Sequence, residues 1–403
     1  MVLARVIGAA DPLDLSLAAV RAGVPRSLLD SVESTLLLIT GLDSEATRAL
    51  GEAVASGGGA ASLIPGHASE RPGSAILAAP TRLVERIAES VAATSPALAR
   101  ALRVAAGAGG APPPLRIGDR LFRFGGRVAV MGVVNVTPDS FSDGGRTLEE
   151  ESAVAHGLRL AESGADVLDV GGESTRPGSS PVSAEEEIQR VLPVVRGLRA
   201  RTAVPISIDT RKADVARAAL AEGAALVNDV SALEFDPELA RVVAEAGVPL
   251  CLMHHQGTPE TMQQQPRYQD AIEEILEFLQ AAIERAVAAG IPRESLLLDP
   301  GIGFGKTFDH NQFILRRLSD LRVLERPVLV GFSRKAFLGA LVGGKPAAER
   351  GGVTAACAAA VVMRGGADIL RVHDVAEVRE AVAVAEAIRE ASDGGALFAS
   401  RSS

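Results

Sequence analysis

The feature that most constrains the fold is an alternation of short apolar segments with amphipathic helical patterns over the last two thirds of the chain. Continuous apolar segments separated by helical patterns are typical of parallel strands covered by helices. Eight such units over about 265 residues match the size and count of a (β/α)8 barrel, the TIM-barrel fold. The eight segments are VAVMGVVN, DVLDV, PISID, ALVND, PLCLM, SLLLD, PVLVG and DILRV.

The barrel pattern leaves the first part of the 403 residues unexplained. Residues 105–115 include the run AAGAGGAPPP, whose composition predicts a linker. We therefore predict a small N-terminal α/β domain over residues 1–104, a barrel domain over residues 116–392 and a disordered tail over residues 393–403. The role of residues 1–115 does not follow from their sequence, which contains no catalytic pattern.

Two segments of the predicted small domain each combine a strand with a following helix. STLLLIT precedes a helical pattern that Asp43 or Ser44 would cap, and SAILAAP precedes one that Thr81 would cap. At the start of the barrel domain, LRIGDRLFRFGGRV predicts a hairpin around Gly118 and Asp119.

Composition excludes several classes of partner and location. A net charge of −9 argues against a general polyanion-binding surface, and 3% aromatic residues without tryptophan argue against stacking on single-stranded nucleic acid. The two cysteines, Cys251 and Cys357, are too few for a disulfide framework. Because Asp11 and Asp14 interrupt the first apolar run and no stretch has the length of a membrane span, we expect a cytoplasmic protein without membrane contact.

Polar side chains occur at or just beyond the C-terminal ends of the predicted strands. In a parallel barrel these ends converge on one mouth, where active sites are built. A helix N-cap explains a single Asp or Asn in such a place, but it does not explain all eight strands. The sequence thus predicts a site made of Asn135, Asp169, Asp209, Asn228, Met253 with His254, Asp299, Ser333 to Lys335, and Arg371 with His373.

Four of these residues suit a flat heterocycle that presents an amino group and a ring N–H. Asp209, Asn228 and Asp299 supply carboxylates and an amide, and Lys335 supplies a donor for ring nitrogen or carbonyl acceptors. Lys335 is informative because the chain has four lysines against 37 arginines. A lysine retained against that preference indicates a site suited to a compact point charge.

The last strand predicts a diphosphate clamp. Arg371 and His373 alternate and so share one face, from which both can donate to phosphate oxygens. Asn135 would complete an anion site or a metal site, since Mg²⁺ prefers oxygen ligands and often keeps several waters beside a substrate phosphate. Zinc spacing is absent, and the adjacent His254 and His255 would face opposite ways on a strand.

Three further segments are rich in glycine. VTPDSFSDGGR and GGESTRPGS have the composition of mobile loops that close over a substrate. DPGIGFGKT is not a nucleotide-binding loop, because Pro300 stands where the first glycine of the phosphate-binding motif belongs.

Eight ordered motifs resemble the dihydropteroate synthase family, and the resemblance extends over residues 116–390. The motifs are MGVVNVTPDSFSDGG, DVGGESTRPGS, SIDTRK, VNDVSAL, LMHHQGTP, LDPGIGFGK, GFSRKAFLG and RVHDV.

The resemblance implies condensation of 6-hydroxymethyl-7,8-dihydropterin diphosphate with 4-aminobenzoate, giving 7,8-dihydropteroate and diphosphate in folate biosynthesis. It also implies Mg²⁺ as cofactor and a homodimer. Family positions carry over as pterin ligands (Asp209, Asn228, Asp299, Lys335), the magnesium ligand (Asn135), diphosphate ligands (Thr175, Arg371, His373) and residues of the loops that shape the aminobenzoate site (Phe141, Asp143, Arg176, Pro177). We expect Asp143 to stabilise a cationic intermediate, with Lys335 and Arg371 as the other catalytic residues.

Two residues depart from the family pattern. Ala336 replaces a serine, which removes a hydroxyl contact to the aminobenzoate carboxylate, and His255 adds a polar group to the pocket. Two other functions stay open: a corrinoid-type, pterin-dependent methyltransferase, which needs no diphosphate clamp, and a silent paralogue that binds pterin without turnover.

Overall fold

The computed structural model describes residues 3–6, 34–56, 62–65, 73–106, 111–136, 145–174, 179, 181–257 and 261–391. Contacts divide the chain into two compact units. The first comprises residues 1–111 with Arg322–Glu325, and the second comprises the remaining residues. No helix among the described residues is long and apolar enough to cross a membrane.

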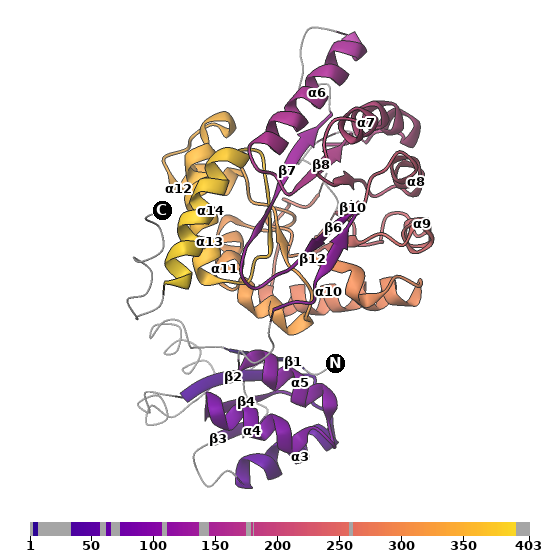
Figure 1. The fold of residues 1–403 in the computed structure, drawn as a ribbon. Coiled ribbons are helices and arrows are strands. Elements are labelled where there is room, and N and C mark those ends of the chain that lie inside the picture. Colours follow the sequence, from indigo (N-terminus) through magenta and orange to yellow (C-terminus); the bar gives the residue numbers. More distant parts are fainter. Residues whose placement is uncertain are drawn as a thin grey trace, which may run out of the picture. The chain divides into compact units, whose positions relative to one another are not determined.

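The second unit is a parallel barrel, which confirms the predicted fold (Figure 1). Its eight strands pair in the order β12-β11-β10-β9-β8-β7-β14-β13, and a bridge between Leu298 and Val328 links the two ends of that order. The strands are β7 Ala129–Asn135, β8 Val167–Gly171, β9 Ile206–Asp209, β10 Leu226–Asp229, β11 Leu250–Met253, β12 Leu296–Asp299, β13 Leu329–Val330 and β14 Ile369–Val372.

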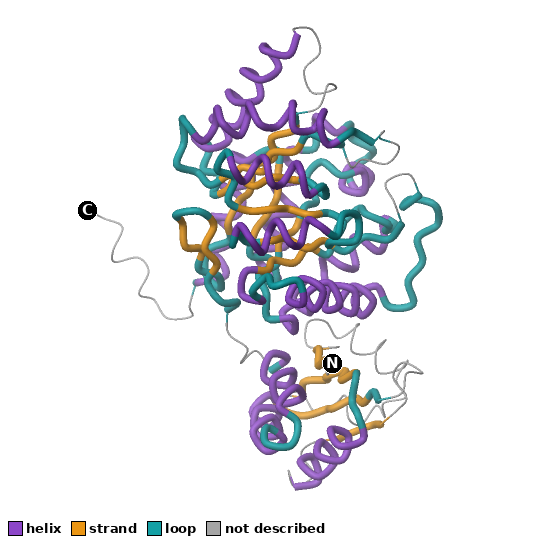
Figure 2. The backbone as a smooth tube through the Cα atoms, turned by 90° about the vertical axis from the view of Figure 1, so that its right-hand side faces the viewer, coloured by secondary structure: helices purple, strands orange, loops and turns teal. Residues whose placement is uncertain are grey.

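Helices surround the strands of this unit (Figure 2). Local chemistry fixes where several of them start: Ser183 accepts from Glu186 N at 3.2 Å, Asp270 accepts from Ile272 N at 3.0 Å, and Thr307 forms a capping box. The helices are α6 Gly145–Glu162, α7 Ala184–Arg199, α8 Ala213–Ala221, α9 Glu238–Ala246, α10 Ala271–Ala288, α11 Phe308–Arg316, α12 Ala336–Leu341, α13 Gly351–Arg364 and α14 Val375–Glu390.

The predicted hairpin is present and covers the N-terminal end of the barrel. β5 (Leu115–Ile117) and β6 (Arg120–Phe122) pair antiparallel around Gly118, whose φ is +56°. Apolar side chains of this hairpin form one buried cluster with residues from the barrel strands, among them Met131 and Leu297. This end is therefore filled largely with apolar side chains, whereas the predicted site residues stand at the opposite, C-terminal ends of the strands.

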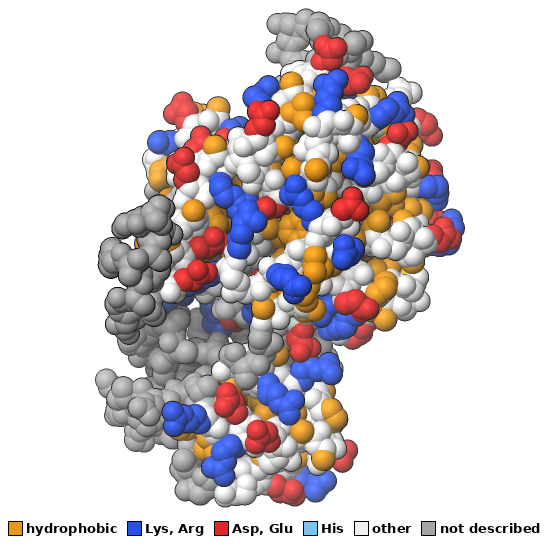
Figure 3. Space-filling model, viewed as in Figure 1, with side chains coloured by type: hydrophobic (Ala, Val, Ile, Leu, Met, Phe, Trp, Pro, Cys, Tyr) orange, Lys and Arg blue, Asp and Glu red, His pale blue; other side chains and the backbone are white. Residues whose placement is uncertain are grey.

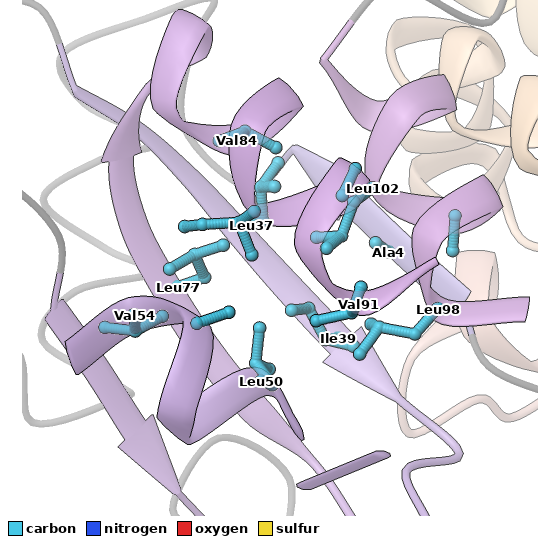
Figure 4. Close-up of a cluster of buried hydrophobic side chains, with 14 of the residues drawn as sticks. Ala4, Leu37, Ile39, Leu50, Val54, Leu77, Val84, Val91, Leu98 and Leu102 are labelled. Atoms are coloured by element: carbon cyan, nitrogen blue, oxygen red, sulfur yellow. The ribbon is translucent and has the colours of Figure 1, made fainter. Parts of the chain in front are cut away.

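The first unit contains a four-stranded antiparallel sheet in the order β1-β2-β4-β3. Three described helices accompany it, and their apolar faces share one buried core with the sheet (Figure 4). The elements are β1 Leu3–Val6, β2 Ser34–Thr40, α3 Ser44–Ser56, β3 Ser62–Pro65, β4 Ala75–Pro80, α4 Thr81–Val91 and α5 Pro96–Ala105.

Both predicted strand-then-helix pairs occur in this unit, with one error at a helix start. Asp43 accepts from Ala46 N at 2.7 Å, as expected for a cap. The cap predicted for Thr81 is wrong, because the extended Pro80 (φ −56°, ψ 142°) occupies the cap position and Thr81 is the first helical residue. The sheet is antiparallel, so its consecutive strands do not form the crossover units of the barrel.

The predicted linker and tail extend beyond what the structure describes. α5 reaches Ala105 and β5 begins at Leu115, while residues 107–110 lie outside the described residues. The predicted tail, residues 393–403, also lies outside them.

Candidate active site

Strand register places the predicted polar residues at one end of the barrel. Asn135 pairs with Gly171, Gly171 with Asp209, and Asp209 with Asn228, so these residues form one row across four neighbouring strands. Asp299 is the last residue of β12 and pairs with Met253. A β-carbon on Gly171 would lie 3.3 Å from the Asp209 β-carbon, so the glycine leaves room for that side chain.

Arg371 of β14 reaches across the barrel and binds two carboxylates. Its Nε donates to Asp169 Oδ2 at 2.6 Å, and its Nη2 donates to Asp209 Oδ2 at 2.6 Å. Burial disfavours the charged guanidinium, but the two carboxylates outweigh this effect and raise the pKa of Arg371. Burial also raises the pKa of Asp209 to about 7, although Arg371 acts in the opposite direction.

Asp169 hydrogen-bonds to two other predicted site residues, which its position in the sequence did not indicate. Its side chain is completely buried, and it accepts from Asn228 Nδ2 at 3.1 Å as well as from Arg371. Its Oδ1 has no hydrogen-bond partner among the described residues. Asp169 thus orients two predicted substrate ligands at once. The available signal was an acid within an apolar strand, which a buried strand tolerates only with partners.

Asp299 and Lys335 both hydrogen-bond to the glycine-rich loop that follows β12. Asp299 Oδ1 accepts from Gly301 N at 2.7 Å, and Lys335 Nζ donates to Ile302 O. The same Nζ lies 4.5 Å from the centre of the Phe304 ring. Burial raises the pKa of Asp299, and burial lowers the pKa of Lys335 to about 8 against the opposing effect of Asp299.

Two of the three glycines of GIGFG are required by close approach of another backbone segment. Gly301 has a φ of +66°, and a β-carbon there would lie 1.8 Å from His254 O. Gly305 has a φ of +65°, and a β-carbon there would lie 2.4 Å from Gln256 O. The loop therefore packs against the segment after β11, a role for its glycines that requires no phosphate.

Lys306, the last residue of LDPGIGFGK, is 1% exposed. Its Nζ lies 2.8 Å from His254 Nδ1 and donates to Phe304 O at 3.0 Å. Burial, with the nearby Lys306 charge second, lowers the pKa of His254 to about 2, so its imidazole is neutral. His254 is consequently a hydrogen-bonding partner within this end of the barrel, packed edge-on against Phe278 at 4.8 Å between ring centres.

His255 occupies a different environment from its neighbour. Its Nε2 lies 3.3 Å from Ser231 O and 3.5 Å from Glu234 Oε2. Its ring also lies against Phe278, with 5.5 Å between ring centres. Because β11 ends at Met253, the alternation expected for a strand does not govern these two histidines.

His373 approaches the site beside the turn that carries Lys335. Its backbone N donates to Ser333 Oγ at 3.1 Å, and its Nδ1 lies 3.1 Å from the same oxygen. Lys335 immediately precedes α12, whose first residue is Ala336. The structure thus joins the ends of β13 and β14 through Ser333.

A buried ion cluster, which the sequence did not reveal, includes Glu173, in the described first part of the GGESTRPGS segment. Lys212 Nζ binds Glu187 at 2.5 Å and Glu173 at 3.2 Å, and Arg211 binds Glu173 at 3.2 Å. Glu187 is completely buried and Glu173 nearly so. Because Glu173 directly precedes Ser174, the cluster anchors the base of that segment.

Five predicted site residues cannot be located in this geometry. They lie outside the described residues and are Phe141, Asp143, Thr175, Arg176 and Pro177.

Asn135 is half-buried at the end of β7. Within the described parts of the chain, no group of three or more His, Cys, Asp or Glu side chains is arranged to hold a metal ion. A protein-only metal cage is thus absent from these parts, whereas one amide oxygen suits an ion that is otherwise held by substrate phosphates and water.

Comparison with known proteins places this geometry among pterin-handling barrels. The family described as pterin binding enzyme matches residues 131–373. The chain is 45% identical to a dihydropteroate synthase of Synechocystis over 69% of this chain and 96% of that protein. It is 47% identical to the dihydropteroate synthase of Escherichia coli over 66% and 93%.

Solved structures give the same picture. A dihydropteroate synthase of Xanthomonas albilineans with 4-aminobenzoic acid is 47% identical and superposes with a TM-score of 0.65, over 70% of this chain and 100% of that chain. A structure of the same enzyme in complex with 7,8-dihydropteroate is 45% identical and gives a TM-score of 0.63, over the same shares.

Proposed function

The chain belongs to the dihydropteroate synthases, a family of pterin-binding enzymes, and we propose which of its residues perform the reaction of that family. The reaction condenses 6-hydroxymethyl-7,8-dihydropterin diphosphate with 4-aminobenzoate and releases diphosphate. The observation that carries the assignment is the row of Asp209, Asn228 and their neighbours at one barrel end, with Arg371 and Lys335 reaching it.

Asp299, Asn228 and Lys335 bind the pterin ring. The Asp299 carboxylate and the Asn228 amide oxygen accept from the amino group and the ring N–H, and Lys335 donates to a ring acceptor. All three groups are held before substrate arrives: Asn228 by Asp169, Asp299 by Gly301 N, and Lys335 by Ile302 O. This preorganisation lowers the cost of ordering the pocket on binding.

Arg371 and His373, together with Thr175, bind the diphosphate. Two of the five N–H donors of Arg371 are used by Asp169 and Asp209, which fixes the plane of the guanidinium and leaves donors for phosphate oxygens. Asn135 would help to hold a magnesium ion, and such an ion would offset negative charge on the diphosphate. The position of Asn135, in register with Gly171 and next to Asp209, supports this placement.

The chemistry is electrostatic and positional. The C–O bond to diphosphate breaks with its electron pair leaving on the diphosphate, and the amine of 4-aminobenzoate then forms the C–N bond and loses a proton to solvent. The pterin ring and Asp143 stabilise the positive charge on the methylene carbon between these events. Arg371 and His373 compensate the charge that develops on the leaving group, and no protein nucleophile is needed.

The protein acts as a homodimer in the cytoplasm. Apolar side chains on α14 support the dimer: Val384 and Ile388 are 59% and 58% exposed and lie one helical turn apart. Met363 on the adjacent α13 is 44% exposed. The two free cysteines, Cys251 and Cys357, suit a reducing compartment.

The decisive experiment measures diphosphate release by the purified protein with the pterin diphosphate, magnesium and 4-aminobenzoate. Release that requires both organic substrates supports the assignment, and no release at any substrate concentration overturns it. A parallel incubation with a methylated reduced folate and a corrinoid protein tests the methyltransferase alternative, for which we expect no transfer. Chelation of the metal should stop release, and activity unaffected by chelation would refute the magnesium assignment.

A further inference from the structure

Arg334 adopts an unusual backbone conformation between two site residues. It lies in the turn from β13 to α12, directly between Ser333 and Lys335, and its φ is +58°. For a residue with a β-carbon, this left-handed region is strained and persists only where the surroundings hold it.

The side chain of Arg334 forms a two-point ion pair with Asp374. Its Nε donates to Asp374 Oδ2 at 2.9 Å, and its Nη2 donates to Asp374 Oδ1. Asp374 stands at the N-cap position of α14, yet its carboxylate makes no capping bond. The carboxylate thus binds Arg334 and does not accept from the backbone N–H groups of the helix, as an aspartate at a helix start usually does.

The backbone of Arg334 is held on both sides as well. Its N donates to the Oγ1 of the fully buried Thr354, at 3.2 Å. Its carbonyl oxygen accepts from Arg350 Nη1 at 2.7 Å. Thr354 lies within α13 and Arg350 directly precedes it, and α13 packs beside α12 and α14 (Figure 1).

The two ends of the ion pair adjoin the two substrate-binding segments. Arg334 is next to Lys335, whose Nζ reaches Ile302 O, and Asp374 is next to His373, whose N reaches Ser333 Oγ. The ion pair is therefore a second connection between the ends of β13 and β14, in addition to the bonds between Ser333 and His373. Loss of the pair would release a strained turn and move both segments.

We propose that Arg334 is a positioning residue: its ion pair with Asp374 holds the strained turn that places Lys335 and His373 against the pterin diphosphate. The proposal rests on the proposed function, since it concerns binding of that substrate. It assigns Arg334 no contact with substrate.

The test compares variants that separate the ion pair from the backbone strain. Arg334→Ala removes the pair and leaves a β-carbon in the left-handed region, whereas Arg334→Gly removes the pair together with the strain. Asp374→Asn weakens the pair while keeping the shape of the side chain. We expect Arg334→Ala and Asp374→Asn to lower kcat/KM for the pterin diphosphate about 10- to 100-fold, because small displacements of positioned groups have effects of that size.

Arg334→Gly should be less impaired than Arg334→Ala. The double variant R334A/D374N should be no worse than Arg334→Ala alone, since both changes break the same interaction.

The matched control is Arg379→Ala. Arg379 also pairs with an aspartate, the buried Asp166, but near the start of β8, at the opposite end of the barrel. That variant should lose thermal stability while keeping kcat and KM.

Amide exchange at His373 gives a readout that does not depend on turnover. Its N–H is protected by Ser333 Oγ, so exchange should accelerate in Arg334→Ala and stay unchanged in Arg379→Ala. Wild-type protein without synthase activity would refute the proposed function, and the exchange data would still decide the role of the ion pair. Wild-type kinetics in Arg334→Ala, an unimpaired Asp374→Asn, or equal kinetic losses in Arg379→Ala would overturn the proposal.

Discussion

The two units of this chain bury different kinds of side chain. In the described part of the first unit, Ser74 is the one buried polar residue, and the core around Leu37 and Leu77 is otherwise aliphatic. The second unit buries lysines as deeply as Lys306, at 1% exposure, and carboxylates as deeply as Asp169, at 0%.

The buried charged side chains of the second unit indicate that the functional site lies in the barrel. Burying a charge costs free energy unless partners satisfy it, so buried charges that are also paired mark places where function or specific order retains them. On the face shown in Figure 3, described Lys and Arg side chains are interspersed with Asp and Glu over the second unit. The concentrated charge lies inside the barrel end, around Arg371 and Lys212, and the described interior of the first unit has no counterpart.

We expect the largest effect from substitution of Lys335 in the barrel. Lys335→Ala removes a half-buried donor from the proposed pterin pocket, and we expect turnover to fall about 100- to 1,000-fold while the circular dichroism spectrum is unchanged. Lys345→Ala is the control, because Lys345 is an exposed lysine of the same unit. Wild-type rates in Lys335→Ala would contradict the assigned role.

The pH dependence should report the same side chain. Because burial lowers the pKa of Lys335 from 10.5 to about 8, the ammonium is present below pH 8 and is lost as the pH rises through that value. We expect kcat/KM for the pterin diphosphate to fall about tenfold per pH unit above the pKa. A profile that stays flat to pH 10 would show that the protonated form of Lys335 is not required.

The buried ion cluster predicts a stability effect that the first unit does not share. Lys212→Met leaves the carboxylate of Glu187 buried without its partner, which should lower the free energy of unfolding by about 3–5 kcal/mol. Chemical denaturation followed by circular dichroism measures this loss.

Leu77→Ala provides the comparison in the first unit. It leaves a cavity in an aliphatic core, which should cost about 2–5 kcal/mol and leave turnover unchanged. If Lys212→Met lowers the free energy of unfolding less than Leu77→Ala does, and also leaves turnover unchanged, then the buried ion cluster contributes neither to stability nor to function as proposed.

Deletion of residues 1–111 should have the smallest effect on catalysis. The matches span 96% and 93% of the two dihydropteroate synthases but only 69% and 66% of this chain. Those relatives therefore have no room for a counterpart of the first unit. We expect the shortened protein to keep the kcat and KM of the full chain. Loss of turnover, or a change in oligomeric state by light scattering, would assign the first unit a part in the function or the assembly.

Much of the barrel and of its site followed from local sequence. The strands were predictable because buried parallel strands are continuously apolar, and the site was predictable because polar residues such as Asp209, Asn228 and Asp299 end those strands. The antiparallel order of the first sheet was not predictable, because strand-then-helix patterns do not specify which strands pair. Thr81 was misassigned because the preceding proline already supplied the extended geometry.

By itself, the sequence determined the barrel, the end at which its polar residues meet and the family to which it belongs. Only the tertiary structure decided the partners: Arg371 binds Asp169 across 202 residues, Lys306 meets His254 across 52, and Arg334 binds Asp374 across 40. The physical reason is that strand periodicity and composition are local properties of the chain. Pairing of charged and polar side chains depends on which strand ends face each other once the barrel has closed.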